Sequence, residues 1–380
     1  MKALSFISHS KQSLFSSSQI TANPTNLSKT DESILKFNQN PIQFNPTFPQ
    51  KNPNFPSLSV NSSQNPDPQN PAPPLVVVGS ANADIYVEID RLPKEGETIS
   101  AKSGQTLAGG KGANQAVCGG KLSYPTYFFG QVGKDANGKL ISEALESGGV
   151  CLDHLRSVSE APTGHAVVML QSDGQNSIII VGGANMCGWP LVIGDKDLEI
   201  VRNAGIVLLQ REIPDSVNIQ VAKAARSAGV PVILDAGGMD APLPGELLEF
   251  VDILSPNESE LSRLTGMPTE TFQQVGEAVT KCYEMGVKQV LVKLGDKGSA
   301  LFIEGEEAVK QPIISAPKVL DTTGAGDTFT AAFAVALIEG QSKQECLRFA
   351  AAAASLCVQV KGAIPSMPDR DSVLNLLRSP

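Results

Sequence analysis

The chain has 380 residues, a mass of 39.9 kDa, a formal net charge of −9 and a pI near 5.0. An acidic chain without basic runs is not typical of nucleic-acid-binding proteins, and no stretch after residue 74 is long and apolar enough to suggest a membrane protein. The six cysteines have neither C-x-x-C pairs nor histidines at ligand spacing, so they predict neither a disulfide framework nor a zinc site.

Residues 1–74 differ in composition from the rest of the chain. They are rich in Ser, Thr, Asn, Gln and Pro, contain no arginine, and have only Asp31, Glu32 and Asp67 as acidic residues. Such a segment cannot bury enough apolar surface to offset the entropy lost on ordering, so we expect it to be disordered. Its composition is typical of a plastid transit peptide, which would place the protein in the plastid stroma. The alternative is a disordered tail without a targeting role.

Short apolar runs alternate with helical patterns from residue 75 onward. The predicted strands are Leu75–Gly79, Thr126–Phe129, Ile206–Leu209, Val232–Leu234, Ile253–Leu254 and Val290–Val292. The predicted helices are Ala136–Ser147, Asp215–Ala228, Thr271–Glu284, Phe329–Ile338 and Lys343–Val358. This alternation predicts an α/β fold with a mostly parallel central sheet and helices on both of its faces. We expect one large domain over residues 75–380.

Two segments break this alternation. Tyr86–Leu107 is more polar and extended, and Gly164–Val181 contains two β-rich runs around Ser172–Gln175, a pattern that predicts a hairpin. Together they are expected to form a small antiparallel sheet beside the main domain. A lid is the functional interpretation of this sheet, and an edge extension or a dimerisation surface is the structural one.

Two motifs early in the domain carry polar side chains. Asn82 and Asp84 follow the first strand, and in an open α/β sheet the residues past a strand's carboxyl end face the ligand crevice. The second motif, Gly109–Ala116, has glycines that permit close backbone approach, together with a lysine and an asparagine. It is not a Walker phosphate loop, because Gly112 follows Lys111 where Ser or Thr is required. Its structural interpretation is a glycine-rich helix start with a solvated lysine.

Three further polar motifs follow predicted strands. Glu212 comes after the third strand, and Asn257 and Glu260 come after the fifth, three residues apart on one face of a starting helix. An amide and a carboxylate so placed can order magnesium-bound water, although helix capping is the structural alternative. Lys293–Gly298 supplies a glycine turn that can pass close to a nucleotide. Because the carboxyl ends of parallel strands share one edge of a sheet, we expect a single site there.

The most specific motif is Asp321–Phe329, a glycine-rich turn that leads into an apolar helix. The amides of Gly324–Gly326 lie at or before the first helical turn, where N–H groups have no intrahelical acceptor and the helix dipole favours an anion. Asp327 at this place can accept a proton from a hydroxyl while the amides hold the charge that develops on a phosphoryl group. The alternative is that Asp327 only caps the helix.

Four of these motifs occur in a recognisable order and spacing: NAD at 82–84, GGKGANQA at 109–116, SPNESE at 255–260 and DTTGAGDTF at 321–329. The set resembles the ribokinase branch of the PfkB carbohydrate kinase family from about residue 75 to the C-terminus. The resemblance implies ATP-dependent phosphorylation of D-ribose at the 5-hydroxyl, with Mg²⁺ and K⁺ as cofactors, by a homodimer formed through the small sheet. The alternatives are a kinase for another pentose or a nucleoside, and a catalytically silent sugar-binding protein.

The resemblance also implies a role for each matching residue. Asp327 would be the base, and Gly324, Ala325 and Gly326 the anion hole. The sugar would contact Asn82, Ala83, Asp84, Gly110, Lys111, Gly112, Ala113, Asn114, Glu212 and Asp327. ATP would contact Asn257, Lys293, Leu294, Gly295, Asp296, Lys297, Gly298 and Gly326. Magnesium would be placed through water by Glu260. Potassium would be bound, mostly by backbone carbonyls, at Asp321, Thr323, Cys357, Val360, Gly362 and Ser366. One departure from the family pattern is Arg211, beside Glu212, where an apolar residue is common.

Overall fold

The computed structural model describes residues 72–171, 176–239 and 241–379. All of them belong to one compact unit. The predicted transit peptide lies outside the described residues except for residues 72–74, and so does the predicted turn at 172–175. No helix of the described part is both long and apolar enough to cross a membrane.

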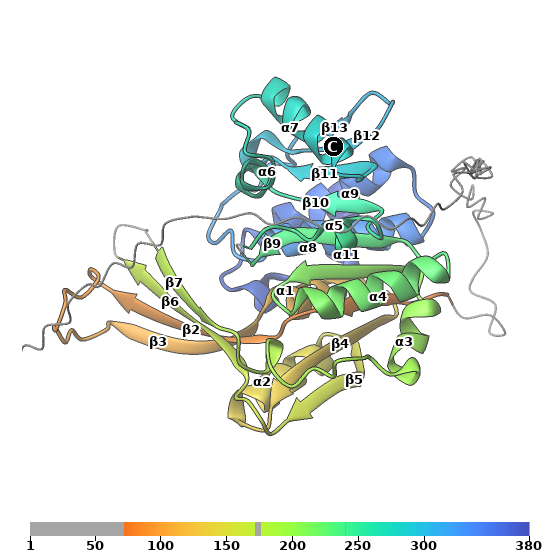
Figure 1. The fold of residues 1–380 in the computed structure, drawn as a ribbon. Helices are drawn as coiled ribbons and strands as arrows, with labels where there is room; N and C mark the ends of the chain where they lie inside the picture. The colour runs from red at the N-terminus through yellow and green to blue at the C-terminus, as the bar shows by residue number, and fades with distance from the viewer. Residues whose placement is uncertain (1–71, 172–175, 240, 380) are drawn as a thin grey trace, which may run out of the picture. The chain divides into compact units, whose positions relative to one another are not determined.

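A nine-stranded sheet forms the centre of this unit (Figure 1). In spatial order its strands are β13 (Val309–Gln311), β12 (Ser299–Ile303), β11 (Gln289–Lys293), β10 (Ile253–Ser255), β9 (Val232–Gly238), β8 (Ile206–Arg211), β1 (Leu75–Val78), β4 (Thr126–Gly133) and β5 (Val150–Val158). From β11 to β5 every neighbouring pair is parallel, whereas β12 and β13 continue the sheet antiparallel. The mostly parallel sheet is therefore confirmed. The strands that the sequence did not predict, β5, β12 and β13, all lie toward the two edges.

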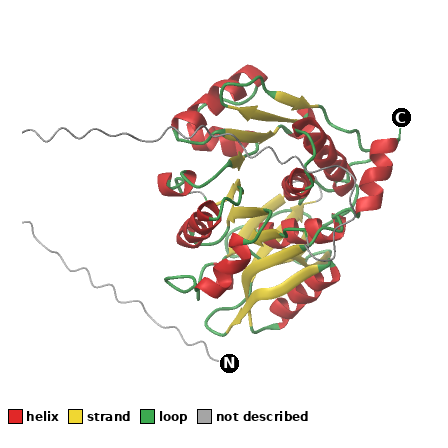
Figure 2. Cartoon of the chain, turned by 90° about the vertical axis from the view of Figure 1, so that its right-hand side faces the viewer, coloured by secondary structure: helices red, strands yellow, loops and turns green. Residues whose placement is uncertain are grey.

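Helices cover both faces of the sheet, as Figure 2 shows. They are α1 (Lys111–Lys121), α2 (Ala136–Ser147), α3 (Asp195–Arg202), α4 (Asp215–Ser227), α5 (Gly245–Leu248), α6 (Glu258–Thr265), α7 (Phe272–Glu284), α8 (Ala325–Ile338), α9 (Lys343–Cys357), α10 (Ala363–Ser366) and α11 (Arg370–Arg378). Alternate residues of β1 enter two different cores. Leu75 and Val77 pack in the core that contains α1, α8 and α9, and Val76 and Val78 in the core that contains α4 and α7. A strand buried on both faces has to be apolar throughout, which is why this run was recognisable in the sequence.

A second, four-stranded sheet projects from one end of the main sheet (Figure 1). Its order is β3 (Ser103–Gly109), β2 (Asn82–Ile89), β6 (Gly164–Gln171) and β7 (Asn176–Val181). The small sheet and the hairpin are confirmed, with one correction: the central pair, β2 and β6, is parallel rather than antiparallel. β2 follows β1 and β6 follows β5, and both β1 and β5 are strands of the main sheet. β2 and β6 therefore both run away from the main sheet, in the same direction. The predicted extended segment is also interrupted, because residues 90–102 form no strand.

Candidate functional site

The first turn of α8 places Asp327 in the interior, where its side chain is only 7% exposed. Gly324 precedes the helix with φ 79°, a left-handed conformation that favours glycine. Asp327 does not cap the helix. Its Oδ2 accepts a hydrogen bond from Asn114 Nδ2 at 2.9 Å, and its Oδ1 accepts one from Gln115 Nε2 at 3.3 Å. Two side-chain amides of α1 therefore orient this carboxylate, and the capping interpretation is not what the structure shows.

The charge around Asp327 is set by its neighbours. Lys111 Nζ lies 3.9 Å from Asp327 Oδ1 and is itself mostly buried. Burial raises the pKa of Asp327; Lys111 opposes this, and the nearby carboxylates of Asp235 and Glu212 reinforce it. The net pKa lies above the ordinary value for an aspartate. A carboxylate with a raised pKa accepts a proton more readily than an ordinary one, so the position suits a general base.

The residues predicted to contact the sugar meet where β2 begins and α1 starts. At Gly110, with φ 91°, a Cβ atom would lie 2.7 Å from the backbone nitrogen of Asn82, so only glycine allows this close approach. Glu212 Oε2 accepts hydrogen bonds from Ser80 Oγ at 2.5 Å and from the amide of Lys111 at 3.1 Å. Ala83, Gly112 and Ala113 lie buried between these side chains.

Two polar groups in this cluster point to a ligand. Asn114 Oδ1 is buried and has no hydrogen-bond partner among the described residues. Burial raises the pKa of Asp84 to about 7, with further contributions from the charges of Glu212 and Asp327. Both groups can accept hydrogen bonds from hydroxyls of a sugar, and an unpartnered buried acceptor is costly without such a donor.

At the opposite side of Asp327, the residues predicted to contact ATP follow β10 and β11. Asn257 caps α6, because its Oδ1 accepts from the amide of Glu260 at 2.8 Å while Glu260 Oε2 accepts from the amide of Asn257 at 2.8 Å. Helix capping by Asn257 and Glu260 is thus confirmed, but it occupies only one of the two oxygens of Glu260. The other oxygen of Glu260 faces the site, because a Cβ atom on Gly237 would lie 2.5 Å from Glu260 Oε1 and 2.6 Å from Lys111 Nζ.

The turn that follows Lys293 is a short 3-10 helix, Gly295–Lys297. Its backbone closes on itself through a hydrogen bond from the amide of Leu294 to the carbonyl of Gly298 at 2.8 Å. The Lys297 ammonium donates to Glu258 Oε1 at 2.8 Å, which ties the turn to α6. Asp296 is exposed on the outside of the turn. The structure thus brings this turn next to Asn257, whose backbone also bridges to Lys293.

The six residues predicted to bind potassium converge between the 321–324 turn and the segment after α9. Asp321 accepts hydrogen bonds from the amides of Thr323 and Gly362, both at 2.8 Å. Cys357 Sγ lies 3.1 Å from Ser366 Oγ and 3.8 Å from the carbonyl oxygen of Thr323. The donors available at this convergence, with Val360 beside it, are mostly oxygens, which fits a hard monovalent cation. Among the described residues, no three His, Cys, Asp or Glu side chains form a metal cluster.

Sequence reasoning missed several residues that the structure places in the site. Asp235 follows a predicted strand and could have been found by the same edge rule as Glu212. Gln115 lies inside the GGKGANQA motif, and Gln210 Nε2 donates to its Oε1 at 2.6 Å. Asn185, which donates to Asn82 Oδ1 at 2.7 Å, gave no signal, because the two are 103 residues apart in sequence.

Arg211, the departure from the family pattern, does not face the sugar. Its side chain is 3% exposed and pairs with Asp215 at 2.7 Å. It also donates to the carbonyl oxygens of Met239, Ala241 and Pro242, at 3.3, 2.7 and 3.2 Å. Arg211 therefore ties Met239, Ala241 and Pro242, which follow β9, to the end of β8.

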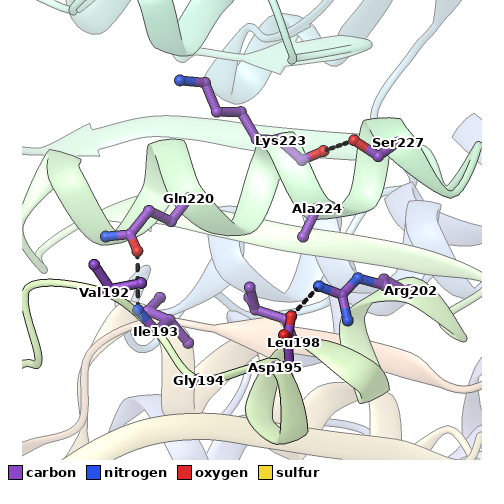
Figure 3. A pocket seen from close by; sticks show the side chains of 10 residues that line it. All are labelled: Val192, Ile193, Gly194, Asp195, Leu198, Arg202, Gln220, Lys223, Ala224 and Ser227. Carbon is purple, nitrogen blue, oxygen red and sulfur yellow. Dashed lines mark hydrogen bonds and ion pairs between the residues drawn. The ribbon is translucent and has the colours of Figure 1, made fainter.

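A separate hollow of about 530 Å³ lies between α3 and α4 (Figure 3). It is lined by residues from Val192 to Arg202 and from Gln220 to Ser227, and its two flanking cations are already paired. Arg202 bonds to Asp195, and Lys223 bonds to Glu246. None of the motif residues lines this hollow. The chemistry described above is therefore concentrated at the carboxyl edge of the main sheet.

Comparisons with known proteins agree with this geometry. The chain matches the sequence profile of the pfkB family carbohydrate kinases over residues 73–370. It is 75% identical to a ribokinase of Arabidopsis thaliana over 328 residues, which cover 85% of this chain and 86% of that protein. The structure of Arabidopsis thaliana ribokinase complexed with ribose and ATP superposes with a TM-score of 0.79 at 77% identity, over 81% of this chain and all of that one. A ribokinase from Thermotoga maritima superposes with a TM-score of 0.72 at 37% identity, over 81% of this chain and 100% of its own. The chain therefore belongs to the pfkB family of carbohydrate kinases.

Proposed function

We propose that this protein is a ribokinase that transfers the γ-phosphoryl group of ATP to the 5-hydroxyl of D-ribose. The observation that carries this proposal is the buried Asp327 at the start of α8, hydrogen-bonded to Asn114 and 3.9 Å from Lys111. It is supported by the 75% identity to the Arabidopsis ribokinase. A silent sugar-binding protein would have no need of a buried, raised-pKa carboxylate at a helix N-terminus.

On the sugar side, Asp84, Asn114 and Glu212 would accept hydrogen bonds from the ribose hydroxyls, and Asn82 and Lys111 would complete the contacts. Asp327 would take the proton of the 5-hydroxyl as its oxygen attacks the γ-phosphorus and the bond to the leaving ADP oxygen breaks. Phosphoryl transfer involves little covalent chemistry of the protein, so orientation and charge stabilisation supply most of the rate.

On the phosphate side, the first-turn amides of α8 would hold the charge of the transferring group. Of the three amides predicted for this role, that of Ala325 already donates to the carbonyl of Thr322 at 3.2 Å. The anion hole would therefore depend most on Gly324 and Gly326, whose lack of side chains lets a phosphate approach the backbone. Asn257 and the Lys293–Gly298 turn would contact the remainder of ATP.

Glu260 would hold Mg²⁺ through water, since its Oε1 faces the site while its other oxygen binds the α6 backbone. Bound Mg²⁺ neutralises phosphate charge. The Asp321–Ser366 convergence would hold K⁺ next to the α8 turn. There Asp321 fixes the two backbone segments at Thr323 and Gly362, so removing its carboxylate would separate the carbonyl ligands.

The small sheet would act as the lid over the sugar and as the surface of a homodimer. β7 is at its edge, and Ile179 and Val181, which share one face of the sheet, are 56% and 41% exposed. One face carries Asp84 and the buried Tyr86, and the other carries apolar residues that the described chain leaves partly exposed. Exposed apolar surface of this kind is typical of protein interfaces.

We further propose that residues 1–74 direct the protein to the plastid stroma and precede a kinase domain at 75–380. The support is compositional: Ser-rich, acid-poor and without arginine. Expression of the first 74 residues fused to a fluorescent protein tests this directly. A fusion that stayed in the cytosol would contradict the targeting role without affecting the proposed activity.

The central test is release of ADP by the full chain with MgATP, measured with D-ribose, 2-deoxyribose, fructose and adenosine, with and without K⁺. Turnover that is strongest with ribose and raised by K⁺ is expected. Turnover that is strongest with another substrate would support the phosphoryl-transfer mechanism but show that D-ribose is not the preferred substrate. A folded protein with no sugar-dependent turnover would contradict the kinase proposal.

A further inference from the structure

An ion pair between Asp235 and Lys293 lies at the carboxyl ends of β9 and β11, inside the candidate site. Lys293 Nζ donates to Asp235 Oδ2 at 2.7 Å. The side chain of Asp235 has no exposed surface, and that of Lys293 is 13% exposed. The carboxylate is thus closed off from solvent, while the lysine side chain keeps a small exposed surface.

Asp235 lies between two lysines, of which one is close to Asp327 and the other is close to the first turn of α8. Its Oδ1 is 3.5 Å from Lys111 Nζ, and Lys111 in turn is 3.9 Å from Asp327. On the other side, a Cβ atom at Gly326 would lie 3.9 Å from Lys293 Nζ, so this ammonium sits beside the first turn of α8. One lysine therefore faces the candidate base and the other faces the candidate anion hole.

The carboxylate of Asp235 is fixed from several directions. Oδ1 also accepts from the amide of Gly237 at 3.0 Å, and Oδ2 lies 3.4 Å from Thr330 Oγ1 on α8. Burial would raise the pKa of Asp235, but the charges on Lys111 and Lys293 outweigh it and hold the pKa well below its usual range. Asp235 is therefore held as a negative charge between Lys111 and Lys293, and Lys111 also faces the carboxylate of Asp327.

A purely structural ion pair is the competing explanation. Burying two charges costs more than their attraction returns unless further hydrogen bonds satisfy them, and well-packed apolar residues often serve stability equally well. Here the ammonium of Lys293 lies beside the N-terminus of α8, where Gly324 and Gly326 have no side chains to cover the backbone. A lysine and a helix N-terminus that meet at one point together favour the binding of an anion there.

We propose that the Lys293 side chain contacts the transferring γ-phosphoryl group, and that Asp235 is a positioning residue that aims Lys293 at this group and Lys111 at Asp327. The proposal rests on the kinase function above. As the bond from the 5-oxygen to phosphorus forms and the bond from phosphorus to ADP breaks, Asp327 receives the hydroxyl proton. Lys293 keeps its own protons and stabilises the charge on the phosphoryl oxygens by donating hydrogen bonds to them.

Kinetics of Lys293→Met test the contact. Removal of one donor to a developing charge is expected to lower kcat by about 100- to 1000-fold, with the dissociation constant for ribose within about threefold of the parent. Lys293→Arg retains a cation and is expected to recover at least about tenfold of the loss. The matched control is Lys288→Met, an exposed lysine just before β11 that pairs with Glu304 at 2.5 Å. A kcat of Lys293→Met within about threefold of the control would overturn the proposal.

The double variant Asp235→Asn/Lys293→Met separates a catalytic contact from a structural one. It removes both charges, so the melting temperature lost by Lys293→Met alone is expected to return toward that of the parent. Turnover is expected to stay low, because no cation faces the phosphoryl group. If turnover returned together with the melting temperature, the pair would be structural only.

Nucleotide titration keeps the test independent of the sugar. Lys293→Met is expected to weaken binding of the non-hydrolysable analogue AMP-PNP by about tenfold and to leave ADP binding unchanged, since only the former carries a γ-phosphoryl group. Equal losses for both nucleotides, or no loss for either, would overturn the role of Lys293. If the parent bound AMP-PNP but did not turn over ribose, the substrate assignment would fail instead.

Discussion

Asp327 is oriented by side chains that come from a different helix rather than by its own. Asn114 and Gln115 of α1 each donate to one of its oxygens, and Gln210 on β8 holds Gln115 in turn. A base held in this way presents a fixed lone-pair direction to an incoming hydroxyl.

Replacing Asp327 by asparagine is expected to lower kcat by about two to four orders of magnitude while ribose binding and folding persist, because the amide cannot accept the hydroxyl proton. Steady-state kinetics and ribose titration measure the two effects separately. Asp153→Asn, an exposed carboxylate on β5, is the matched control and should be indistinguishable from the parent. A kcat for Asp327→Asn within a factor of a few of this control would remove Asp327 from the base role.

The protonation of Asp84 predicts a pH dependence of sugar binding. Its pKa is raised to about 7 by burial, by Glu212 and by Asp327. The ionised carboxylate accepts stronger hydrogen bonds from hydroxyls than the protonated group does, so the KM for ribose is expected to rise about tenfold between pH 8 and pH 6. The KM for ATP, measured over the same range, should change much less. A flat ribose profile in the parent would contradict the assignment of Asp84.

Stability supplies the control for Asp84→Asn. In the folded protein the pKa of Asp84 lies above its unfolded value of 3.8, so the folded state binds more protons between about pH 4 and pH 7. Ionisation of Asp84 therefore removes stability as the pH rises through this window. Asp84→Asn should be at least as stable as the parent at pH 8 while showing weak, pH-independent ribose binding. If Asp84→Asn were strongly destabilised, its weak ribose binding would be explained by misfolding and not by the loss of the carboxylate.

At the scale of elements, the order of the strands decides which side chains meet. β8, β9, β10 and β11 are adjacent and parallel, so Glu212, Asp235, Asn257 and Lys293 come to one edge although they span 82 positions of sequence. α8 lies against this edge and adds Asp327 from the far end of the domain. Arg211 at the end of β8 binds the carbonyl oxygens of Met239, Ala241 and Pro242, which follow β9.

Arg211→Met is expected to destabilise the protein by about 3 kcal/mol, because Asp215 and three backbone carbonyls lose a buried cationic partner. Urea or thermal unfolding measures the effect. Arg226→Met is the matched control: Arg226 also pairs with an aspartate, Asp252, but its side chain is 53% exposed, so a loss below about 1 kcal/mol is expected. Equal losses of unfolding free energy in the two variants would show that the buried hydrogen bonds of Arg211 stabilise the protein no more than an exposed ion pair does.

At the scale of the whole molecule, the second sheet carries an apolar face that the described chain does not cover. The strand register places alternate residues on this face: Ile85, Val87, Val167, Met169, Ile179 and Val181. The opposite face carries Asp84, Tyr86 and Val168 and turns toward the 321–323 turn, since Tyr86 contacts Thr323. One face is thus turned toward the site, and the other is the surface through which we propose that the dimer forms.

Ile179→Asp is therefore expected to convert the proposed dimer into a monomer, because a charge would be buried in the interface. Analytical ultracentrifugation of the full chain measures this. The neighbouring Ile178→Asp is the matched control: Ile178 is similarly exposed but points to the other face, so the dimer should persist. Dissociation of both variants alike, or of neither, would contradict the assignment of faces.

Some features of this protein follow from local sequence because their causes are local. Strands such as Leu75–Val78 are apolar throughout since both faces are buried, and helices such as α7 and α9 begin at Thr271 and Ser342, where a capping box marks the start. The Asp321–Phe329 motif could be interpreted as an anion site because helix geometry leaves its first amides free. These residues determined the fold class and most of the candidate site.

Only the tertiary structure decided the rest, because it depends on which strands become neighbours. The parallel pairing of β2 with β6, the contact of Asn185 with Asn82 and the burial of Arg211 join segments that no local pattern relates. Asp235 and Lys293 are 58 residues apart in the sequence, and they form an ion pair only because the fold brings β9 and β11 together. Local propensity specifies each element, but the electrostatics of a site are set by distances that exist only after the elements pack together.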